Sequence, residues 1–244
     1  MRHLLLIVLL LGSWVGGLAQ SPSVDEARRQ WDLVVAAKAD PGVLRNVRNF
    51  HLSQKGGAPE EFLSVFPDKS WDWQNIGTKY FGQFIDMYDA SAQMKYSIQN
   101  KNKDAKLKPF EKGDNFGFMR AATAWVTLVG PGLETAPLES KIGPSKTIVL
   151  SVRVNGQHLD YVIDQTTYLI KEVRYFLRNT RGPGEDEIRR DRLSDYKVVQ
   201  GIKVPTMQNG RKISFEFNVD YNPEIFMRVL TPDEFGPNAW RPAK

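Results

Sequence analysis

The stretch TIVLSVRVNGQHLDYVID, residues 147–164, decides the fold class of this chain. Apolar and polar side chains alternate along both of its halves, which is the pattern of a strand with one buried face. Asn155 and Gly156 stand between the halves, and this residue pair favours the two-residue turn of a β-hairpin. We therefore expect an antiparallel hairpin with strands at 147–154 and 158–164.

The same alternation predicts more strands on both sides of this hairpin. They cover residues 48–54, 62–66, 70–74, 84–88, 94–100, 169–178, 187–197, 202–207 and 212–219. In the strand at 169–178, one face is expected to carry Leu169, Lys171, Val173, Tyr175 and Leu177.

Helical spacing predicts helices at 25–39 and 43–47, and the composition of 118–128 is typical of a third. Residues 101–117 and 130–146 are rich in charges, Gly or Pro, and we expect loops there. The prediction is a mainly β (α+β) fold: a large curved antiparallel sheet with two or three helices covering one face.

The first residues have the pattern of a secretory signal peptide. A basic start at residues 1–3 precedes an unbroken apolar run at 4–11, and Gly17 and Ala19 supply the small residues of a cleavage site. We expect cleavage after Ala19, which leaves one domain at 20–244 without a transmembrane segment. With no cysteine to carry a lipid, that domain is predicted to be soluble and periplasmic.

Composition excludes several kinds of chemistry. The 244 residues include no cysteine and three histidines, so thiol catalysis, disulfides and cysteine-ligated zinc are excluded. Nucleophile-elbow, phosphate-binding and dinucleotide-binding motifs do not occur. Carboxylate pairs such as Glu60 and Glu61 lie in charged surroundings that favour solvation. We expect no catalytic residues, no cofactor and no metal, and a formal charge of +5 is too small to predict a nucleic-acid partner.

Three longer segments resemble a known superfamily. They are AAKADPGVLRNVRNFHLSQKG at 36–56, VRVNGQHLDYVIDQTTYLIKEVRYF at 152–176 and LSDYKVVQGIKVPTMQNGRKISFEFNVDYNPEI at 193–225. Their turn and strand motifs resemble the LolA/LolB-like lipoprotein-carrier superfamily, which includes outer-membrane lipoprotein-sorting-like proteins. The resemblance implies a half-open antiparallel barrel around helices, with an apolar cavity for acyl chains.

One position departs from the superfamily pattern. The resemblance implies an arginine directly before the proline of an early strand, where it latches a lid over the cavity. Here Phe66 precedes Pro67, and the nearest cation is Lys69.

The main functional hypothesis is an exported carrier or binding protein that holds a lipid or an acylated protein, as in envelope lipoprotein or lipid trafficking. An apolar cavity would suffice, because burying each CH₂ group contributes about 0.8 kcal/mol. The predicted lining is the apolar face of the clearest strands: Met94, Tyr96, Ile98, Ile148, Leu150, Val152, Leu159, Tyr161, Ile163, Ile213, Phe215, Phe217 and Val219. The same residues could instead pack against the helices and leave no space.

Two alternatives remain open at this stage. The chain could be a scaffold or sensor domain that binds an envelope protein through the curved sheet or its basic loops. Contacts to that partner, or to an anionic headgroup, are predicted at Arg189, Arg190 and Arg192. An enzyme acting on envelope polymers would need two converging carboxylates, or a histidine–carboxylate contact at His51 or His158.

Overall fold

The computed structural model describes residues 24–67, 69–77, 82–89, 91–99, 105–110, 137–154, 157–177 and 187–242. The predicted signal peptide, the predicted helix at 118–128 and the turn at 155–156 lie outside the described residues.

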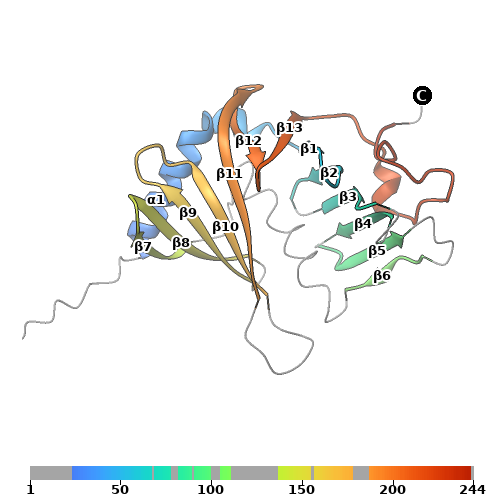
Figure 1. Ribbon diagram of the computed structural model, residues 1–244, viewed down its shortest axis with the longest axis horizontal. Coiled ribbons are helices and arrows are strands. Elements are labelled where there is room, and N and C mark those ends of the chain that lie inside the picture. Colours follow the sequence, from blue (N-terminus) through green and yellow to red (C-terminus); the bar gives the residue numbers. More distant parts are fainter. Residues whose placement is uncertain are drawn as a thin grey trace, which may run out of the picture.

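One antiparallel sheet dominates the described residues (Figure 1). Its thirteen strands are β1 (Asn49–Lys55), β2 (Glu60–Val65), β3 (Lys69–Asn75), β4 (Gln83–Asp89), β5 (Met94–Gln99), β6 (Lys108–Pro109), β7 (Pro137–Gly143), β8 (Thr147–Val154), β9 (Gln157–Asp164), β10 (Ile170–Leu177), β11 (Glu187–Val199), β12 (Ile202–Gln208) and β13 (Arg211–Phe217).

The strand order shows how the sheet is assembled. It runs β6-β5-β4-β3-β2-β1-β13-β12-β11-β10-β9-β8-β7, so two runs of sequential strands meet where β1 pairs with β13. The sheet bends into two walls and does not close, because β6 and β7 stand at opposite ends of this order (Figure 1). The predicted curved, half-open antiparallel sheet is confirmed.

Two α-helices precede the sheet, α1 (Val24–Lys38) and α2 (Pro41–Arg45). Between them, the Asp40 side chain accepts a hydrogen bond of 2.6 Å from the Gly42 N–H, and Pro41 occupies the first helical position. Both features favour a helix start at this point. A 3₁₀-helix, η1 (Pro223–Phe226), follows the last strand.

The loop predictions for 101–117 and 130–146 were wrong in part, because β6 and β7 lie within them. β7 pairs with β8 along its length and forms an edge of the sheet. Edge strands tolerate proline and charged side chains, which limit unwanted pairing. The edge strand β7 therefore has the composition of a loop, because it contains Pro137, Glu139 and Lys141.

The predicted face of β10 was also wrong at its start. Ile170 is fully buried and Lys171 is exposed, the reverse of the expected alternation. The pairing of β10 with β9 shifts register between Ile170 and Glu172. This irregularity inserts a residue, so that Ile170 and Val173 are both buried.

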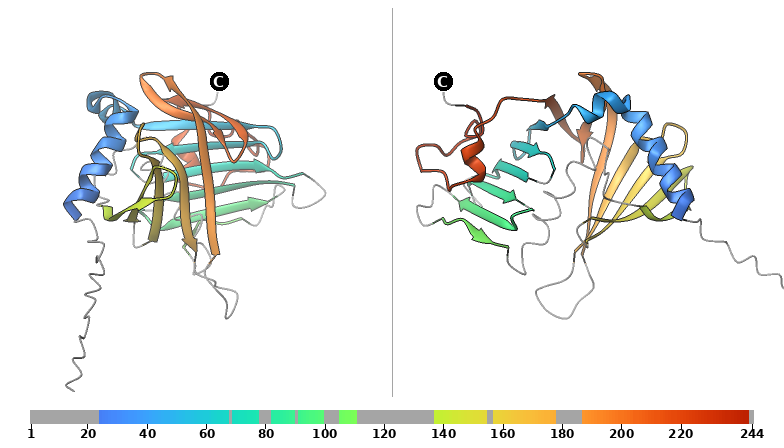
Figure 2. Two further views of the ribbon diagram at one scale, coloured as in Figure 1. Left: turned by 60° about the vertical axis from the view of Figure 1, so that its left-hand side comes forward. Right: turned by 180° about the vertical axis from the view of Figure 1, so that it is seen from behind.

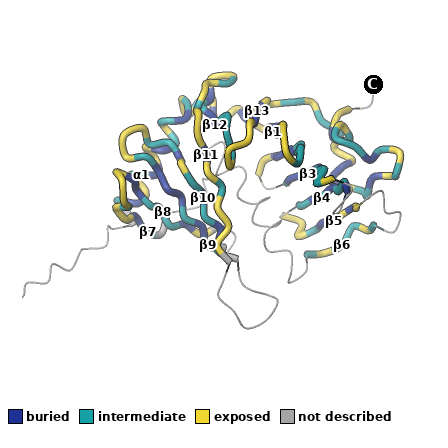
Figure 3. The backbone as a smooth tube through the Cα atoms, in the orientation of Figure 1, coloured by how far each residue is buried: buried dark blue, intermediate teal, exposed yellow. Residues whose placement is uncertain are grey.

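The sheet buries different faces in its two walls, as the cross-strand register shows. We call the face that packs on α1 and α2 the helix face, and the other the opposite face. In β3, β4 and β5 the opposite face is buried, under the C-terminal segment 219–242 that contains η1 (Figure 2). In β8–β13 the helix face is buried. β2 lies at the change, with Phe62 on the helix face and Leu63 on the opposite face, both nearly inaccessible. Buried residues are found in both walls of the sheet (Figure 3).

Candidate functional site: the apolar helix face

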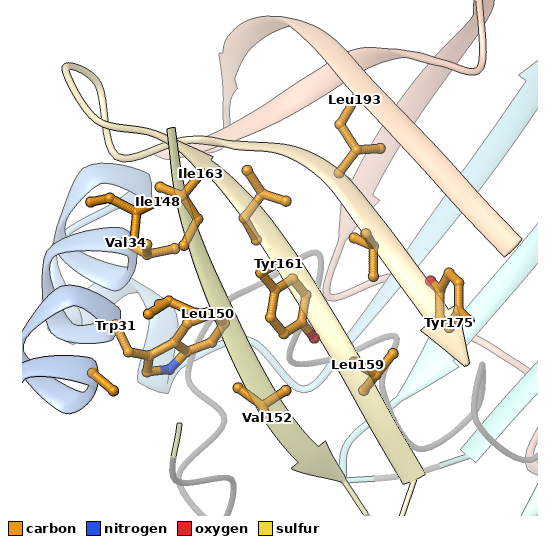
Figure 4. Packing of buried hydrophobic residues seen from close by; sticks show 13 residues of the cluster. Trp31, Val34, Ile148, Leu150, Val152, Leu159, Tyr161, Ile163, Tyr175 and Leu193 are labelled. Atoms are coloured by element: carbon orange, nitrogen blue, oxygen red, sulfur yellow. The ribbon is translucent and has the colours of Figure 1, made fainter. Parts of the chain in front are cut away.

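Helix α1 packs on the helix face of β8, β9 and β10. Trp31 and Val34 of α1 point toward the side chains of these strands (Figure 4). The Trp31 and Tyr161 ring centroids lie 5.1 Å apart. The strand side of this contact is built from cross-strand pairs, such as Leu150 opposite Tyr161, which bring aliphatic and aromatic groups together. The result is a continuous apolar surface below one helix.

A second apolar cluster extends this surface toward β1 and β13. Phe50 lies opposite Phe217 in the β1–β13 pair, and its ring centroid is 5.9 Å from that of Phe215. Leu44 of α2 is buried in the same cluster. Val35 of α1 packs against both clusters, so they adjoin on the helix face.

The structure brings together nine of the thirteen predicted lining residues. The nine are buried on the helix face: Ile148, Leu150, Val152, Leu159, Tyr161, Ile163, Ile213, Phe215 and Phe217. Whether they line a ligand site stays a prediction.

The other four predicted lining residues do not join them. Tyr96 and Ile98 are buried on the opposite face, in the cluster formed with the C-terminal segment. Met94 shares that face by alternation along β5, and Val219 packs against the same cluster. Alternation assigned these residues to one side of a strand, but it could not indicate which side the helices cover.

The sequence analysis did not predict that a charged residue is buried on the helix face. Lys38 shared the helical spacing of Trp31 and Val34, yet a lysine in the last turn of a helix is usually solvated and complements the helix dipole. In the structure Lys38 is 3% exposed. This burial lowers the pKa of its ammonium group from 10.5 to about 7.

The three predicted contact arginines do not form a single patch. On β11, Arg190 lies opposite Arg174 and Arg192 lies opposite Glu172, on the opposite face. Arg192 Nε is 3.5 Å from the Glu172 carboxylate. Arg189 is opposite Tyr175 and therefore belongs to the helix face. A partner surface built on this cluster stays a prediction.

The carboxylate between these arginines is a structural ion-pair centre. Arg174 Nε donates to Glu172 Oε1 at 2.6 Å. Partial burial raises the pKa of Glu172, but the hydrogen bonds and charges of Arg174, Arg190 and Arg192 outweigh it and lower the pKa overall. Glu172 thus remains a paired anion.

Both histidines of the described residues contact carboxylates, which is one of the two arrangements that an enzyme would need. His51 Nε2 lies 2.6 Å from Glu61 Oε2, and His158 Nε2 lies 3.1 Å from Asp160 Oδ1. The nearby serine hydroxyls donate to the carboxylates instead of the imidazoles: Ser53 to Glu61 at 2.9 Å and Ser151 to Asp160 at 2.6 Å. Neither arrangement has the serine–imidazole hydrogen bond that activates a nucleophile.

Lys69, the cation nearest to the expected latch position, contacts the C-terminal segment. Lys69 Nζ lies 2.7 Å from Asp89 and 5.9 Å from the ring centroid of Phe226. Both contacts are on the opposite face, where Phe226 belongs to the C-terminal segment. Lys69 therefore holds that segment to the sheet and does not reach the helix face.

The described residues contain neither a cluster of metal ligands nor a membrane-spanning helix. Within them, no three His, Cys, Asp or Glu side chains gather closely enough to hold a metal ion. The helices of the same residues are too short or too polar to cross a bilayer.

Similarity to known proteins is found at the level of structure. No protein-family model matches the sequence, and no curated protein matches it. Among solved structures, the chain is similar to a "putative outer membrane lipoprotein-sorting protein domain" from Vibrio parahaemolyticus, with a TM-score of 0.45 and 11% sequence identity. The alignment covers 82% of this chain and 97% of that domain.

Proposed function

We propose that this chain is an exported periplasmic carrier or binding protein, which holds the acyl chain of a lipid or acylated protein against the helix face. The observation that supports the proposal is the pair of adjoining apolar clusters on the helix face. Together the clusters cover the strands of one wall and extend to β1 and β2, and α1 is the long helix that packs on them. The proposed role is in envelope lipoprotein or lipid trafficking.

Helix α1 is the element that an acyl chain would displace. The strands beneath it are each held by backbone hydrogen bonds to neighbouring strands. Helix α1 contributes Ala27, Trp31 and Val34, and the partly buried Val35, to the apolar cluster on β8–β10. A ligand with ten buried methylene groups would gain about 8 kcal/mol, comparable to what three such side chains gain by packing. An acyl chain can therefore replace the helix without breaking the sheet.

Trp31 offers a direct test, because it is the tryptophan of the helix face among the described residues. Delipidated protein is titrated with a brominated fatty acid, which quenches the fluorescence of an adjacent indole. We expect saturable quenching that falls sharply in Trp31→Phe. The matched control is Trp73→Phe on the opposite face, which should retain the quenching.

The proposal fails if the brominated acid gives no saturable quenching and native mass spectrometry detects no bound lipid. It also fails if Trp31→Phe and Trp73→Phe change the quenching equally, because the acyl chain would then lie elsewhere.

A further inference from the structure

Strand β7 is the edge of the sheet beside β8, and in the part of the chain that the structure describes no strand pairs with its outer side (Figure 1). In an antiparallel pair, alternate residues bond to the neighbouring strand, and the residues between them turn their N–H and C=O groups away from it. β7 therefore directs backbone groups outward, where another strand can add to the sheet.

The side chains near the end of β7 are accessible to such a strand. Glu139 and Lys141 lie opposite Ser151 and Val149 of β8, which places both on the face turned away from α1. Their side chains are 35% and 63% exposed. Ile142 is 84% exposed, more than any other large hydrophobic residue of the described ranges. An open apolar side chain at a sheet edge favours pairing with another strand.

The charges of β7 are ordered so that the strand complements itself. Glu139 and Lys141 are two positions apart on one face and form an ion pair of 2.9 Å within the chain. In an antiparallel pair of two β7 strands centred on Ser140, Glu139 of each copy would lie opposite Lys141 of the other. Opposite charges in directly opposed positions stabilise a sheet. Ile142 would lie opposite position 138 of the other copy, and the added strand would cover part of it.

The same charges select one register. A pair centred on Glu139 sets two carboxylates opposite each other, and a pair centred on Lys141 does the same with two ammonium groups. Like charges in opposed positions destabilise a sheet. A pair centred between two residues would set side chains of one face against those of the other, which the pleat of a sheet does not allow. Pairing about Ser140 is the arrangement that both the charges and the pleat favour.

We propose that two copies of this chain associate by antiparallel pairing of their β7 strands about Ser140, which joins their two sheets into one. The interface has two-fold symmetry, because the same strand serves in both copies. A single strand pair is a small interface, so we expect a weak dimer with a Kd of about 10–100 µM. This association does not depend on the proposed function.

Charge reversal with complementation tests the pairing. Sedimentation velocity measures the oligomeric state of the full chain over concentrations that span the expected Kd. Lys141→Glu alone and Glu139→Lys alone should each weaken the dimer about tenfold, because each sets like charges opposite each other. An equimolar mixture of the two variants should dimerise again, because an acidic strand then pairs with a basic one.

Lys212→Glu is the matched control. Lys212 is exposed on β13, which is an interior strand of the sheet, so its reversal should leave the dimer unchanged. Circular dichroism shows whether each variant is folded. Because the chain has no cysteine, Glu139→Cys and Lys141→Cys provide a second measurement. Under mild oxidation, a mixture of these two variants should form a disulfide-linked dimer faster than either variant alone.

The proposal is overturned if the natural chain sediments as a monomer at every concentration. It is also overturned if reversal at Lys212 weakens the dimer as much as reversal at Lys141, or if the mixture of reversed variants stays monomeric. Should a reversed variant be unfolded, the cysteine pair decides: equal rates of linkage in the mixture and in the single variants would show that β7 does not pair with itself.

Discussion

His51 and Trp240 stack with their ring centroids 4.4 Å apart, and this contact joins the first strand of the sheet to the end of the described chain. Trp240 is 1% exposed, and its carbonyl accepts a hydrogen bond of 2.8 Å from the Asn222 N–H. The C-terminal segment is therefore part of the core and not an appendage.

Trp240→Ala should destabilise the protein strongly. Removing a fully buried indole leaves a cavity and also removes the partner of His51, so we expect a loss of about 3–5 kcal/mol in the free energy of unfolding. Urea denaturation measures this loss. Arg241→Ala is the control, because Arg241 is exposed beside Trp240 and should change stability by less than about 1 kcal/mol. Equal effects of the two variants would contradict a core role for the segment.

The ion pair of Arg228 and Glu234 should make the stability of the protein depend on pH in the acidic range. Both Arg228 terminal nitrogens donate to Glu234, at 2.8 and 2.6 Å, and these bonds, followed by that from the Thr231 N–H, lower the pKa of Glu234 from 4.5 to about 2. A lowered acid pKa stabilises the folded state above 4.5, and the contribution is lost as pH falls toward 2. The pair is more than a third exposed, so we expect a contribution of about 1 kcal/mol or less.

Glu234→Gln tests this pH dependence by thermal denaturation. Its melting temperature should lie below that of the natural chain at pH 6, and the gap should shrink at pH 2.5. Asp233→Asn changes the neighbouring carboxylate and serves as the comparison. A Glu234→Gln gap that is constant over this pH range would show that the pair does not contribute as described.

The stability of Lys38→Met relative to the natural chain should increase as the pH falls. With a folded pKa of about 7 and an ordinary value of 10.5, the unfolded chain holds the proton more tightly. The cost of burying the charge is therefore complete below pH 7 and is relieved as pH rises toward 10.5. Melting curves should show a larger gain at pH 6 than at pH 9.5. A gain that is smaller at pH 6 than at pH 9.5 would contradict this sign.

The irregular start of β10 can be tested with two adjacent substitutions. Ile170→Ala removes a fully buried side chain and should cost about 2–5 kcal/mol. Lys171→Ala changes an exposed side chain and should alter stability by less than about 1 kcal/mol. If strict alternation continued through Lys171, chemical denaturation would show a larger loss of stability for Lys171→Ala than for Ile170→Ala.

Much of the fold was predictable because local patterns carry it. Alternation located the strands of the hairpin at 147–164, and the prediction of a curved antiparallel sheet followed from such strands. The edge strand β7 was missed, because Pro137 and its charged neighbours suit both a loop and an edge. The register shift at Ile170 comes from pairing with β9, which a single strand does not encode.

The candidate site was predictable only in part. Alternation grouped Tyr96 with Ile98 and Phe215 with Phe217, but the C-terminal segment covers the first pair and helices cover the second. Which segment covers each pair depends on packing between parts of the chain that are far apart in sequence. Lys38 was missed because charge usually indicates exposure, whereas here the position in the helix determines burial.

The pairing of β1 with β13 also determines when the protein can fold. Asn49 bonds to Val219, 170 positions later, so the middle of the sheet forms only after nearly the whole chain is available. Contacts over such distances slow folding. A nascent chain that ends before residue 211 would expose the β1 edge that β13 covers, and this edge is a template for aggregation. This delayed closure makes the last strand the step that completes the sheet.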